Sequence, residues 1–454
     1  MRIALFGGSF NPPGKHHREI AAALAKEFDE VVVVPCGPRR DKPALNEVAP
    51  CYRAAMVDLT FAGLPKVRVE LFDMEQSTFT PSWRLDERFR PQGEIWHVVR
   101  ADFIEGGRRG ASVIQRQWER GTELWNTARF AIIARRDRQI ERDDLPPNAR
   151  IIEVAEDGVD LTLRSRVYHR DDTEGLLLPR VKELIERYGL YRGASAISSF
   201  ASIALDELRL KVVVDERNPK ALELKKQVEP YVSDDPNLIA VIGGDGTMLR
   251  AIRQHWRERL PFYGINTGHL GFLLNDVSPV SCESRDLVAC HVALLYVEVE
   301  KLSGEHAAAV AFNDAWVERA TGQTAWIEVR VDGKVRLTQL VADGALVATA
   351  AGSTSYARAM GATPVPLNTP ALTLVGSNVL RPSFWRPVVL PLDSEIEFRT
   401  LDPDKRPLDG YIDGVAQGEI RWLRARASRI AAVELVFAPG HDPAAKLAQI
   451  QFPG

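Results

Sequence analysis

The sequence predicts an α/β multidomain protein that ends in an all-β domain, on the basis of three observations. The chain has 454 residues, more than one hydrophobic core usually supports, so two or three domains are expected. Short apolar strands alternate with helical patterns up to about residue 190 and again after residue 208. From about residue 290, short strand-like runs separated by turn residues replace the helical periodicity.

The first predicted domain covers residues 1–191. Two β-branched runs, 2–6 and 30–35, enclose a segment with apolar Ile20 and Leu24 at a helical spacing. A strand–helix–strand unit of this kind implies a parallel sheet with helices on its faces, in a Rossmann-like arrangement. Further predicted elements are strands at 94–102 and 128–136 and a closing amphipathic helix at 176–191.

The rest of the chain is predicted to hold a linker and two more domains. A run of small residues begins after Arg192, and we interpret 192–207 as the linker. A second α/β domain follows at 208–289, and an all-β sandwich with one embedded helix at 290–454.

Composition narrows the class of protein. Apolar residues make up 45% and charged residues 26%, and the formal net charge is -3, which argues against nucleic acid as the main partner. None of the four cysteines forms a C-x-x-C pair, so neither a disulfide framework nor a zinc site is expected. The apolar run 2–6 is too short for a signal peptide, and no run is long enough to cross a membrane. We therefore expect a cytoplasmic protein that binds neither membrane nor nucleic acid.

The strongest candidate site is "VIGGDGTML" at 241–249. A buried strand is predicted to end at Gly243, Gly244 and Gly246 flank Asp245, and a helix is predicted to start at Thr247. Glycines let backbone N–H groups approach a phosphate closely, and the helix N-terminus favours an anion. A carboxylate would repel that phosphate unless it binds Mg²⁺ or accepts a proton from an attacking hydroxyl. A plain strand-to-helix turn remains the alternative.

Two weaker candidates follow in the all-β region. Asn313 and Asp314 pair an amide with a carboxylate, which suits a ribose or an amide, although such a pair is most often a turn. Asp343 precedes a predicted strand, and Ser353 and Thr354 form a hydroxyl-rich turn before a helix that starts near Tyr356. Hydroxyl residues at a helix start are commonly N-caps, so a purely structural turn is the alternative here as well.

Taken in order, these pieces resemble the NAD kinase family. They are "GGDGTML", "NTGHLGFL", "FND", "DGALVATAAGSTSY", "RPVVLP" and "YIDG", and the likeness runs from about Leu208 to the end of the chain. The resemblance implies an α/β domain followed by a β-sandwich, with the active site between them. It also implies the substrates NAD and ATP, with Mg²⁺ bridging the phosphates.

The same resemblance assigns residue roles. Asp245 activates the 2′-hydroxyl of the adenosine ribose of NAD for attack on the γ-phosphate of ATP. The implied NAD- and ATP-binding residues are Gly244, Gly246, Thr247, Phe272, Asn313, Asp314, Asp343, Ser353, Thr354 and Tyr356, with Gly352 shaping a phosphate turn. The chain departs from the family where Ala350 replaces a proline and Ala351 a threonine. The residues for phosphoryl transfer remain, so activity is expected.

The opening stretch "GGSFNPPGKHH" at 7–17 resembles the nicotinamide or nicotinate mononucleotide adenylyltransferases. That family places His-x-Gly-His at a helix start, where this chain has Gly14, Lys15, His16 and His17. Only the second histidine, His17, is retained, and Lys15 is expected to supply compensating charge. The other implied site residues are Gly7, Gly8, Ser9, Phe10 and Asp102, with Thr162 and Arg164 in place of a late Ser-Ser-Thr-x-x-Arg loop.

The sequence therefore predicts an ATP-dependent NAD kinase fused to an adenylyltransferase-like domain with degraded motifs. The alternative is a bifunctional enzyme that also makes NAD, or its nicotinate precursor, from the mononucleotide and ATP. Two further hypotheses are a lipid kinase of the GGDGT type and a sensor that binds a dinucleotide without turnover. A homo-oligomer is expected, whereas the donor (ATP or polyphosphate) and the preference between NAD and NADH stay open.

Overall fold

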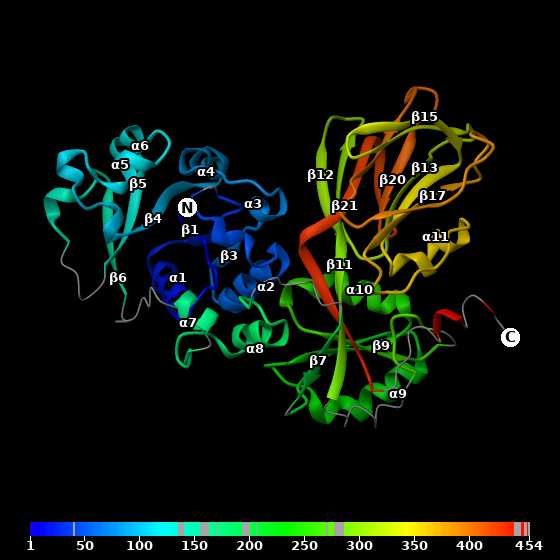
Figure 1. The fold of residues 1–454 in the computed structure, drawn as a ribbon, viewed down its shortest axis with the longest axis horizontal. Helices are drawn as coiled ribbons and strands as arrows, with labels where there is room; N and C mark the ends of the chain where they lie inside the picture. The colour runs from blue at the N-terminus through cyan, green and yellow to red at the C-terminus, as the bar shows by residue number, and fades with distance from the viewer. Residues whose placement is uncertain are drawn as a thin grey trace. The chain divides into compact units, whose positions relative to one another are not determined.

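The computed structural model describes eleven stretches of the chain. These are residues 1–39, 41–134, 140–154, 163–169, 171–192, 200–205, 207–268, 271–276, 286–439, 446–448 and 452. The chain divides into two compact units, Met1–Ile197 and Ser198–Gly454, which Figure 1 shows as ribbons. Within the described stretches, none of the helices has the length and apolar character needed to cross a membrane.

The first unit is built on a six-stranded sheet in the order β3-β2-β1-β4-β5-β6. Its strands are β1 (Arg2–Gly8), β2 (Glu30–Pro35), β3 (Val67–Val69), β4 (Glu94–Arg100), β5 (Arg129–Ala134) and β6 (Ala149–Glu153). Every neighbouring pair is parallel. The strand order reverses between β1 and β4, and open α/β sheets bind ligands beyond the carboxyl ends of the strands at such a point.

Among the described residues of this unit, eight α-helices connect and cover the strands. They are α1 (Lys15–Glu27), α2 (Pro50–Phe61), α3 (Phe72–Glu75), α4 (Ser82–Phe89), α5 (Val113–Gln117), α6 (Gly121–Thr127), α7 (Leu163–His169) and α8 (Pro179–Arg187). The predicted apolar face of α1 is confirmed, because Ile20 and Leu24 pack with Phe6 in one buried cluster. The predicted closing helix is shorter than expected, since Pro179 opens α8 at its first turn.

The second unit begins with a parallel layer. Its strands are β8 (Leu210–Val214), β9 (Leu238–Gly243) and β10 (Phe262–Asn266), and its helices are α9 (Pro219–Val228) and α10 (Asp245–His255). The end of β21 (Val415–Phe437) continues this layer by pairing in parallel with β10. The long β11 (Asp286–Lys301) runs antiparallel along β21, and β7 (Phe200–Ala204) pairs with β11.

This arrangement differs from the domain boundaries expected from the sequence. The expected boundary between 289 and 290 falls inside β11, and part of the expected linker forms β7. The physical reason is that β11 and β21 are long enough to serve both the parallel layer and the β-rich layer. The last residues of β21 therefore return to a layer that starts more than 200 residues earlier in the sequence.

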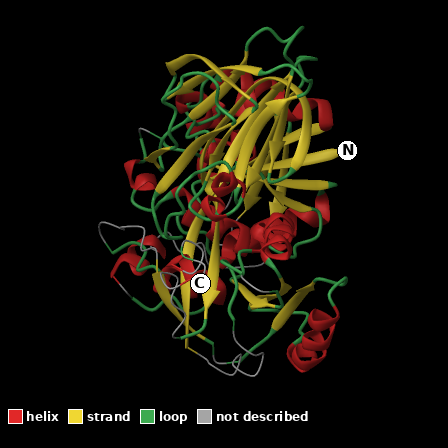
Figure 2. Ribbon diagram, turned by 90° about the vertical axis from the view of Figure 1, so that its right-hand side faces the viewer, coloured by secondary structure: helices red, strands yellow, loops and turns green. Residues whose placement is uncertain are grey.

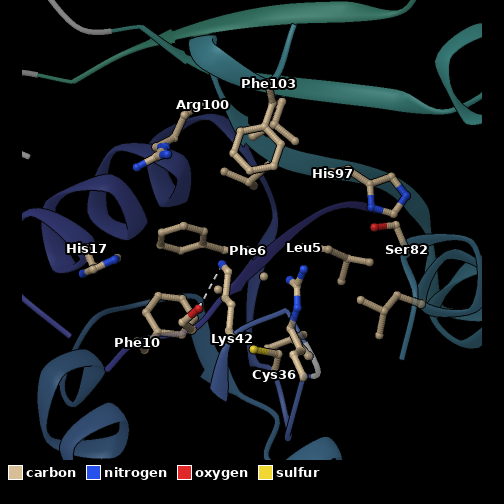
Figure 3. A pocket seen from close by; sticks show the side chains of 18 of the residues that line it. Leu5, Phe6, Phe10, His17, Cys36, Lys42, Ser82, His97, Arg100 and Phe103 are labelled. Atoms are coloured by element: carbon tan, nitrogen blue, oxygen red, sulfur yellow. Dashed lines mark hydrogen bonds between the residues drawn. The ribbon is translucent and has the colours of Figure 1, made fainter. Parts of the chain in front are cut away.

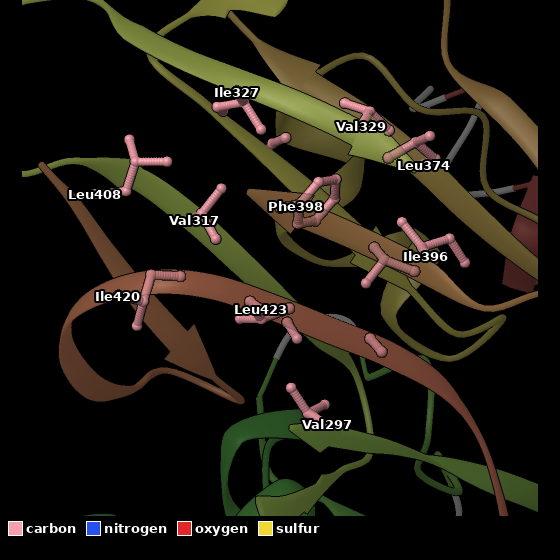
Figure 4. Close-up of a cluster of buried hydrophobic side chains, with 14 of the residues drawn as sticks. Val297, Val317, Ile327, Val329, Leu374, Ile396, Phe398, Leu408, Ile420 and Leu423 are labelled. Carbon is pink, nitrogen blue, oxygen red and sulfur yellow. The ribbon is translucent and has the colours of Figure 1, made fainter. Parts of the chain in front are cut away.

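Strands make up most of the remaining part of the second unit (Figure 2). They are β12 (His306–Ala311), β13 (Asp314–Arg319), β14 (Ala325–Val331), β15 (Lys334–Ala342), β16 (Gly344–Ala348), β17 (Ala371–Ser377), β18 (Val388–Pro391), β19 (Ile396–Thr400) and β20 (Leu408–Ile412). Their inward residues form one apolar core around Phe398 and Ile327 (Figure 4). A short helix, α11 (Tyr356–Ala359), is embedded among them. The predicted fold class, with two α/β regions and an all-β region, is confirmed.

Candidate functional site

The GGDG turn lies between β9 and α10, as predicted. Gly243 ends the fully buried β9, Gly244 caps α10, and Asp245 is the first helical residue. The Thr247 N–H donates to the Gly244 carbonyl at 2.9 Å, which closes the first turn. A Cβ added at Gly244 or Gly246 would meet no atom within 4 Å. The backbone of this turn is therefore open to an approaching ligand.

The Asp245 carboxylate is fixed by a second segment of the chain. Its Oδ2 accepts the Phe272 N–H at 3.0 Å, and its Oδ1 accepts the Leu273 N–H at 3.0 Å. Burial raises the pKa of Asp245 above its usual range, although the two N–H groups and Lys446 oppose that rise and Asp276 adds to it. A buried carboxylate with a raised pKa is a better proton acceptor than an exposed one. Phe272 contributes through its backbone, while its side chain lies in the core.

Asn313 and Asp314 are held by an aspartate from far along the chain. The Asp413 carboxylate accepts the N–H groups of Phe312, Asn313 and Asp314 at 2.7, 2.9 and 3.2 Å. Asp413 has a φ of 46°, so the turn that carries it is in the left-handed region. The Oδ1 of Asn313 is buried and has no hydrogen-bond partner among the described residues.

The charges of Asp314 and Asp413 interact strongly. Burial and the charge of Asp413 raise the pKa of Asp314 to about 7. Three backbone donors favour the ionised form of Asp413 and oppose the effect of its burial on its pKa. Asp314, which is 4% exposed, therefore titrates close to neutral pH.

The hydroxyl-rich turn packs directly on Asn313. Gly352 opens a 3₁₀ turn, Gly352–Thr354, and a Cβ at Gly352 would lie 2.1 Å from the Asn313 carbonyl oxygen. Only glycine fits there. The hydroxyls of Ser353 and Thr354 donate to the carbonyls of Ala350 and Ala351 at 2.6 and 3.1 Å. Both hydroxyl groups thus stabilise the turn by donating to carbonyls three residues earlier, and no side-chain cap is formed by the described residues at the start of this turn or of α11.

Tyr356 and Asp343 lie further out on the same part of the sheet. Tyr356 packs edge-on against Trp316 with ring centroids 5.2 Å apart. Burial and the charges of Glu318, Asp314 and Asp343 raise the pKa of Tyr356. Asp343 precedes β16, whose other end, Ala348, pairs with Asp314. Five residues of strand place the Asp343 backbone roughly 17 Å from Ala348, and the Asp343 carboxylate pairs with Arg319 at 2.8 Å.

The structure brings three of the predicted segments of the second unit onto one apolar cluster, although these segments are far apart in the sequence. Met248, Phe272, Phe312 and Ala351 belong to that cluster, so the GGDG turn, the Phe272 loop and the turn before Tyr356 all pack on it. Asp343 lies apart from the cluster, as does Tyr356, which packs on Trp316. Sequence reasoning missed Asp413 and Thr349, whose hydroxyl donates to the Phe312 carbonyl at 2.7 Å. The quoted "YIDG" motif contains Asp413 and was the available signal.

The first unit has a separate pocket of about 660 Å³ at the carboxyl ends of β1 and β4. Gly7, Gly8, Ser9 and Phe10 line it, as does His17 from α1. Figure 3 shows His17, Lys42 and Arg100 around the space beside Phe6 and Phe10. The pocket occupies the reversal point of the strand order, where α/β sheets bind nucleotides.

A buried arginine and a lysine fix the turn after β1. Arg53, which is 2% exposed, donates to the carbonyls of Ser9 and Cys36 at 3.0 and 2.6 Å. Lys42 Nζ donates to Ser9 Oγ at 3.3 Å. Lys15, expected to supply charge here, begins α1 and is not among the residues that line the pocket, whereas Lys42 is.

The surroundings of Gly14 show how this chain fills the position that holds the first histidine of the His-x-Gly-His pattern. The Gly14 N–H donates to His17 Nδ1 at 3.0 Å, so the neutral ring carries its proton on Nε2. Burial, His16 and Arg100 hold the pKa of His17 well below its usual range. A Cβ at Gly14 would lie 2.8 Å from both His16 Nδ1 and Leu163 Cδ2. The volume of the family's first histidine is therefore occupied by His16 and Leu163.

The remaining adenylyltransferase-like residues are engaged in ion pairs. Arg100 Nη2 contacts Asp102 Oδ2 at 2.7 Å, and a second bond at 3.1 Å makes the pair bidentate. Arg164 lines the pocket and pairs with Glu47. Thr162 lies outside the described residues. Across the described stretches, no three His, Cys, Asp or Glu side chains are grouped to hold a metal ion.

Comparisons with known proteins agree with this organisation. A family model described as the ATP-NAD kinase N-terminal domain matches residues 180–280. A model described as cytidylyltransferase-like matches residues 5–174. The resemblances inferred from the motifs, a NAD kinase and a nucleotidyltransferase-like domain, are confirmed.

Individual relatives cover about half of this chain and nearly all of their own length. The NAD kinase of Zymomonas mobilis is 35% identical over 237 residues, 51% of this chain and 92% of that protein. The NAD kinase of Rickettsia bellii is 30% identical over 253 residues, 55% of this chain and 99% of that protein. The NAD kinase of Rhizorhabdus wittichii is 36% identical over 236 residues, 51% of this chain and 92% of that protein. On this evidence the chain belongs to the NAD kinase family.

Proposed function

We propose that the second unit transfers the γ-phosphoryl group of ATP to the 2′-hydroxyl of the adenosine ribose of NAD, giving NADP. The observation that carries this proposal is the placement of Asp245. Its carboxylate is buried at the first residue of α10, beside an open glycine turn, and is held by two backbone N–H groups. The substrates are inferred from membership of the family, and Asp245 is inferred to be the base from its geometry.

The reaction needs one base and a site for phosphate charge. Asp245 accepts the proton of the 2′-hydroxyl while the 2′-oxygen forms a bond to the γ-phosphorus of ATP. The bond between the γ-phosphorus and the β-phosphate oxygen breaks, which releases ADP. Each Asp245 oxygen accepts one N–H, which leaves lone pairs for the incoming proton. The N–H groups at the start of α10 face the phosphates, where the helix dipole favours negative charge.

The dinucleotide is held by the second turn. Asn313 offers a buried, unpartnered Oδ1 that accepts a hydrogen bond from a ligand donor. Asp314, which is partly protonated at neutral pH because its pKa is about 7, donates one in its protonated form, and Tyr356 contributes an aromatic face. Mg²⁺ suits this site as a companion of ATP, because phosphate oxygens complete its coordination when a protein supplies few carboxylates. When bound, it neutralises charge on the transferred phosphoryl group.

Product analysis tests the proposal. The full chain is incubated with Mg-ATP and NAD, and the expected product is NADP. Asp245→Asn is expected to lower kcat by about 10²–10⁴-fold, the range for loss of a general base. Absence of NADP from the parent, or parental turnover by Asp245→Asn, contradicts it. Phosphorylation of a diacylglycerol instead, or NAD binding without turnover, would favour a lipid kinase or a sensor. Assays with polyphosphate in place of ATP, and with NADH in place of NAD, determine which phosphoryl donor and which acceptor the enzyme uses.

For the first unit we propose a nucleotide-binding role, with nucleotidyl transfer as a second candidate function. The supporting observation is the pocket at the strand-order reversal, lined by His17, Lys42 and Arg100. Nucleotidyl transfer aligns a mononucleotide phosphate with the α-phosphate of ATP and needs such cationic and donor groups. Incubation with Mg-ATP and nicotinamide or nicotinate mononucleotide tests it. A dinucleotide product lost in His17→Ala supports catalysis, and binding without product leaves only the nucleotide-binding role.

We further propose a cytoplasmic homo-oligomer. Large apolar side chains are exposed on and before β18, with Leu380 65%, Phe384 89% and Val389 54% exposed, and such patches mark association sites. Of the described cysteines, Cys36 and Cys290 are free thiols, as in a reducing compartment. Light scattering is expected to give more than one chain per particle, and Phe384→Ser is expected to lower that number. A monomeric parent contradicts the oligomer.

A further inference from the structure

Lys446 is a buried lysine close to the end of the chain. It is 7% exposed, and lysines are almost never this buried unless they are paired. Its Nζ donates to the Gly271 carbonyl at 2.7 Å and to the Leu274 carbonyl, and it contacts Asp276 Oδ2 at 2.9 Å. The next residue, Leu447, packs on the apolar cluster that contains Phe272. All three polar partners of Lys446 therefore belong to the segment 271–276.

That segment is the one that holds Asp245. The Gly271 carbonyl and the Phe272 N–H belong to one peptide unit, in which the two groups point in opposite directions. Lys446 donates to the carbonyl on one side, and the N–H donates to Asp245 on the other. A cation on the carbonyl polarises the peptide and strengthens its N–H as a donor, because hydrogen bonds in a chain reinforce one another.

The segment has another anchor that does not involve Lys446. The Asn275 side chain donates to the carbonyls of Gly264 and Val436 at 3.0 and 3.1 Å and accepts the Ala438 N–H at 2.9 Å. These bonds fix the far end of the segment to β10 and to the end of β21. Lys446 contacts carbonyls nearer to Asp245. Its removal is therefore expected to loosen the part that holds the carboxylate while Asn275 keeps the segment in place.

We propose that Lys446 is a positioning residue for phosphoryl transfer, which orients the Asp245 carboxylate through the peptide joining Gly271 and Phe272. This inference rests on the proposed function, because it gives Lys446 a task only if Asp245 is the base. The charges that face Asp245 support it. Lys446 lowers the pKa of Asp245, whereas Asp276 raises it. The lysine thus favours the ionised form of a buried base, and the neighbouring carboxylate has the opposite effect.

Lys446→Met tests the inference in the full chain, because methionine keeps much of the buried length without charge or donor. We expect kcat for NADP formation to fall about tenfold, the scale of a small misplacement of a catalytic group. The KM for ATP is expected to stay within about twofold. The acidic limb of the kcat–pH profile is expected to move to higher pH. Lys446→Arg, which retains charge and donors, is expected to recover part of the rate. Lys334→Met, at an exposed hairpin position, is the matched control.

Asp276→Asn gives an independent arm should Lys446→Met not fold. Removing this carboxylate lowers the pKa of Asp245, so the acidic limb is expected to move to lower pH, opposite to Lys446→Met. A merely structural contact would not move the limb in opposite directions. A Lys446→Met enzyme with parental kcat and limb, or Asp276→Asn with an unmoved limb, overturns the inference. A parent that makes no NADP overturns the proposed function instead, so the two failures are distinguishable.

Discussion

The two candidate sites begin with the same device, a glycine turn between the end of a strand and the start of a helix. After β9, a Cβ at Gly244 or Gly246 would meet open space. After β1, a Cβ at Gly14 would meet His16 and Leu163 at 2.8 Å each. The turn after β9 leaves its backbone accessible. In the turn after β1, the space beside Gly14 is filled by the side chains of His16 and Leu163.

This difference shows that a glycine in a turn between a strand and a helix can be needed for opposite reasons. In the kinase site, glycines keep the approach to the backbone open, and Asp245 is supported from a separate segment. In the first unit, Gly14 is needed because its neighbours leave no room. The four predictions below test that contrast, from the largest expected effect to the smallest.

Gly352→Ala is expected to have the largest effect. The added Cβ would lie 2.1 Å from the Asn313 carbonyl oxygen, which is backbone and cannot swing away. The turn must move off Asn313, and a displacement of about 1 Å near the substrate can cost roughly 10²-fold in rate. We expect kcat/KM for NAD to fall by that amount in a steady-state assay. Gly322→Ala, where a Cβ meets nothing within 4 Å, is the matched control, and equal losses in both variants would contradict the explanation.

Asp314→Asn is expected to change how stability depends on pH. The folded pKa of Asp314 is raised from 3.8 to about 7, so the native state holds a proton that the unfolded state has released between those values. Stability is therefore lost as pH rises through that window. Asparagine imitates the protonated acid and removes the cost. At about 1.4 kcal/mol per pKa unit, the variant is expected to gain roughly 2–4 kcal/mol at pH 8 relative to pH 4.

Urea unfolding across this pH range measures the gain. Asp404→Asn changes an exposed carboxylate and is expected to leave the pH dependence as it is in the parent. A gain in Asp314→Asn that is the same at low and high pH would show that the pKa of Asp314 is not raised in the folded protein.

A double change, Gly14→His with His16→Gly, restores the family's order of residues in the first unit. Gly14→His alone is expected to disturb the pocket, because its Cβ meets His16 and Leu163. The double variant removes one of those two contacts. If the lost histidine limits nucleotidyl transfer, dinucleotide synthesis is expected to rise about tenfold, the lower end of what one acid–base group contributes. Synthesis that stays at the parental rate in a folded double variant would show that another residue limits the site.

The sequence predicted these sites unevenly, and the reasons are physical. Asp245 could be predicted because the features that mark its site lie next to it in the sequence. The strand, the glycines and the helix start lie within a few residues. His17 was predictable for the same reason, since its partner Gly14 is three residues away.

Residues that act across long separations were not predictable in this way. Asp413 holds Asn313 from a distance of 100 residues, and Lys446 reaches Gly271 from 175 residues away. Lys42 contacts Ser9 from 33 residues further along the chain. The domain boundaries in the structure differ from those expected from the sequence for a related reason, because β21 forms part of two layers. Local patterns carry no information about such pairings.

His16→Gly alone is expected to have the smallest effect, on the titration of His17. His16 lowers the pKa of His17, after burial and ahead of Arg100, and its ring centroid is 3.9 Å from that of His17. Replacing it removes a like charge and admits water, so both changes move the pKa of His17 upward, toward its usual range. Histidine-labelled protein followed by NMR measures the shift, with His17→Gln to assign the signal. His306→Ala, in the second unit, is expected to leave it unmoved. A pKa that stays low in His16→Gly would mean that burial alone keeps His17 neutral, and that the crowding beside Gly14 is a matter of shape and not of charge.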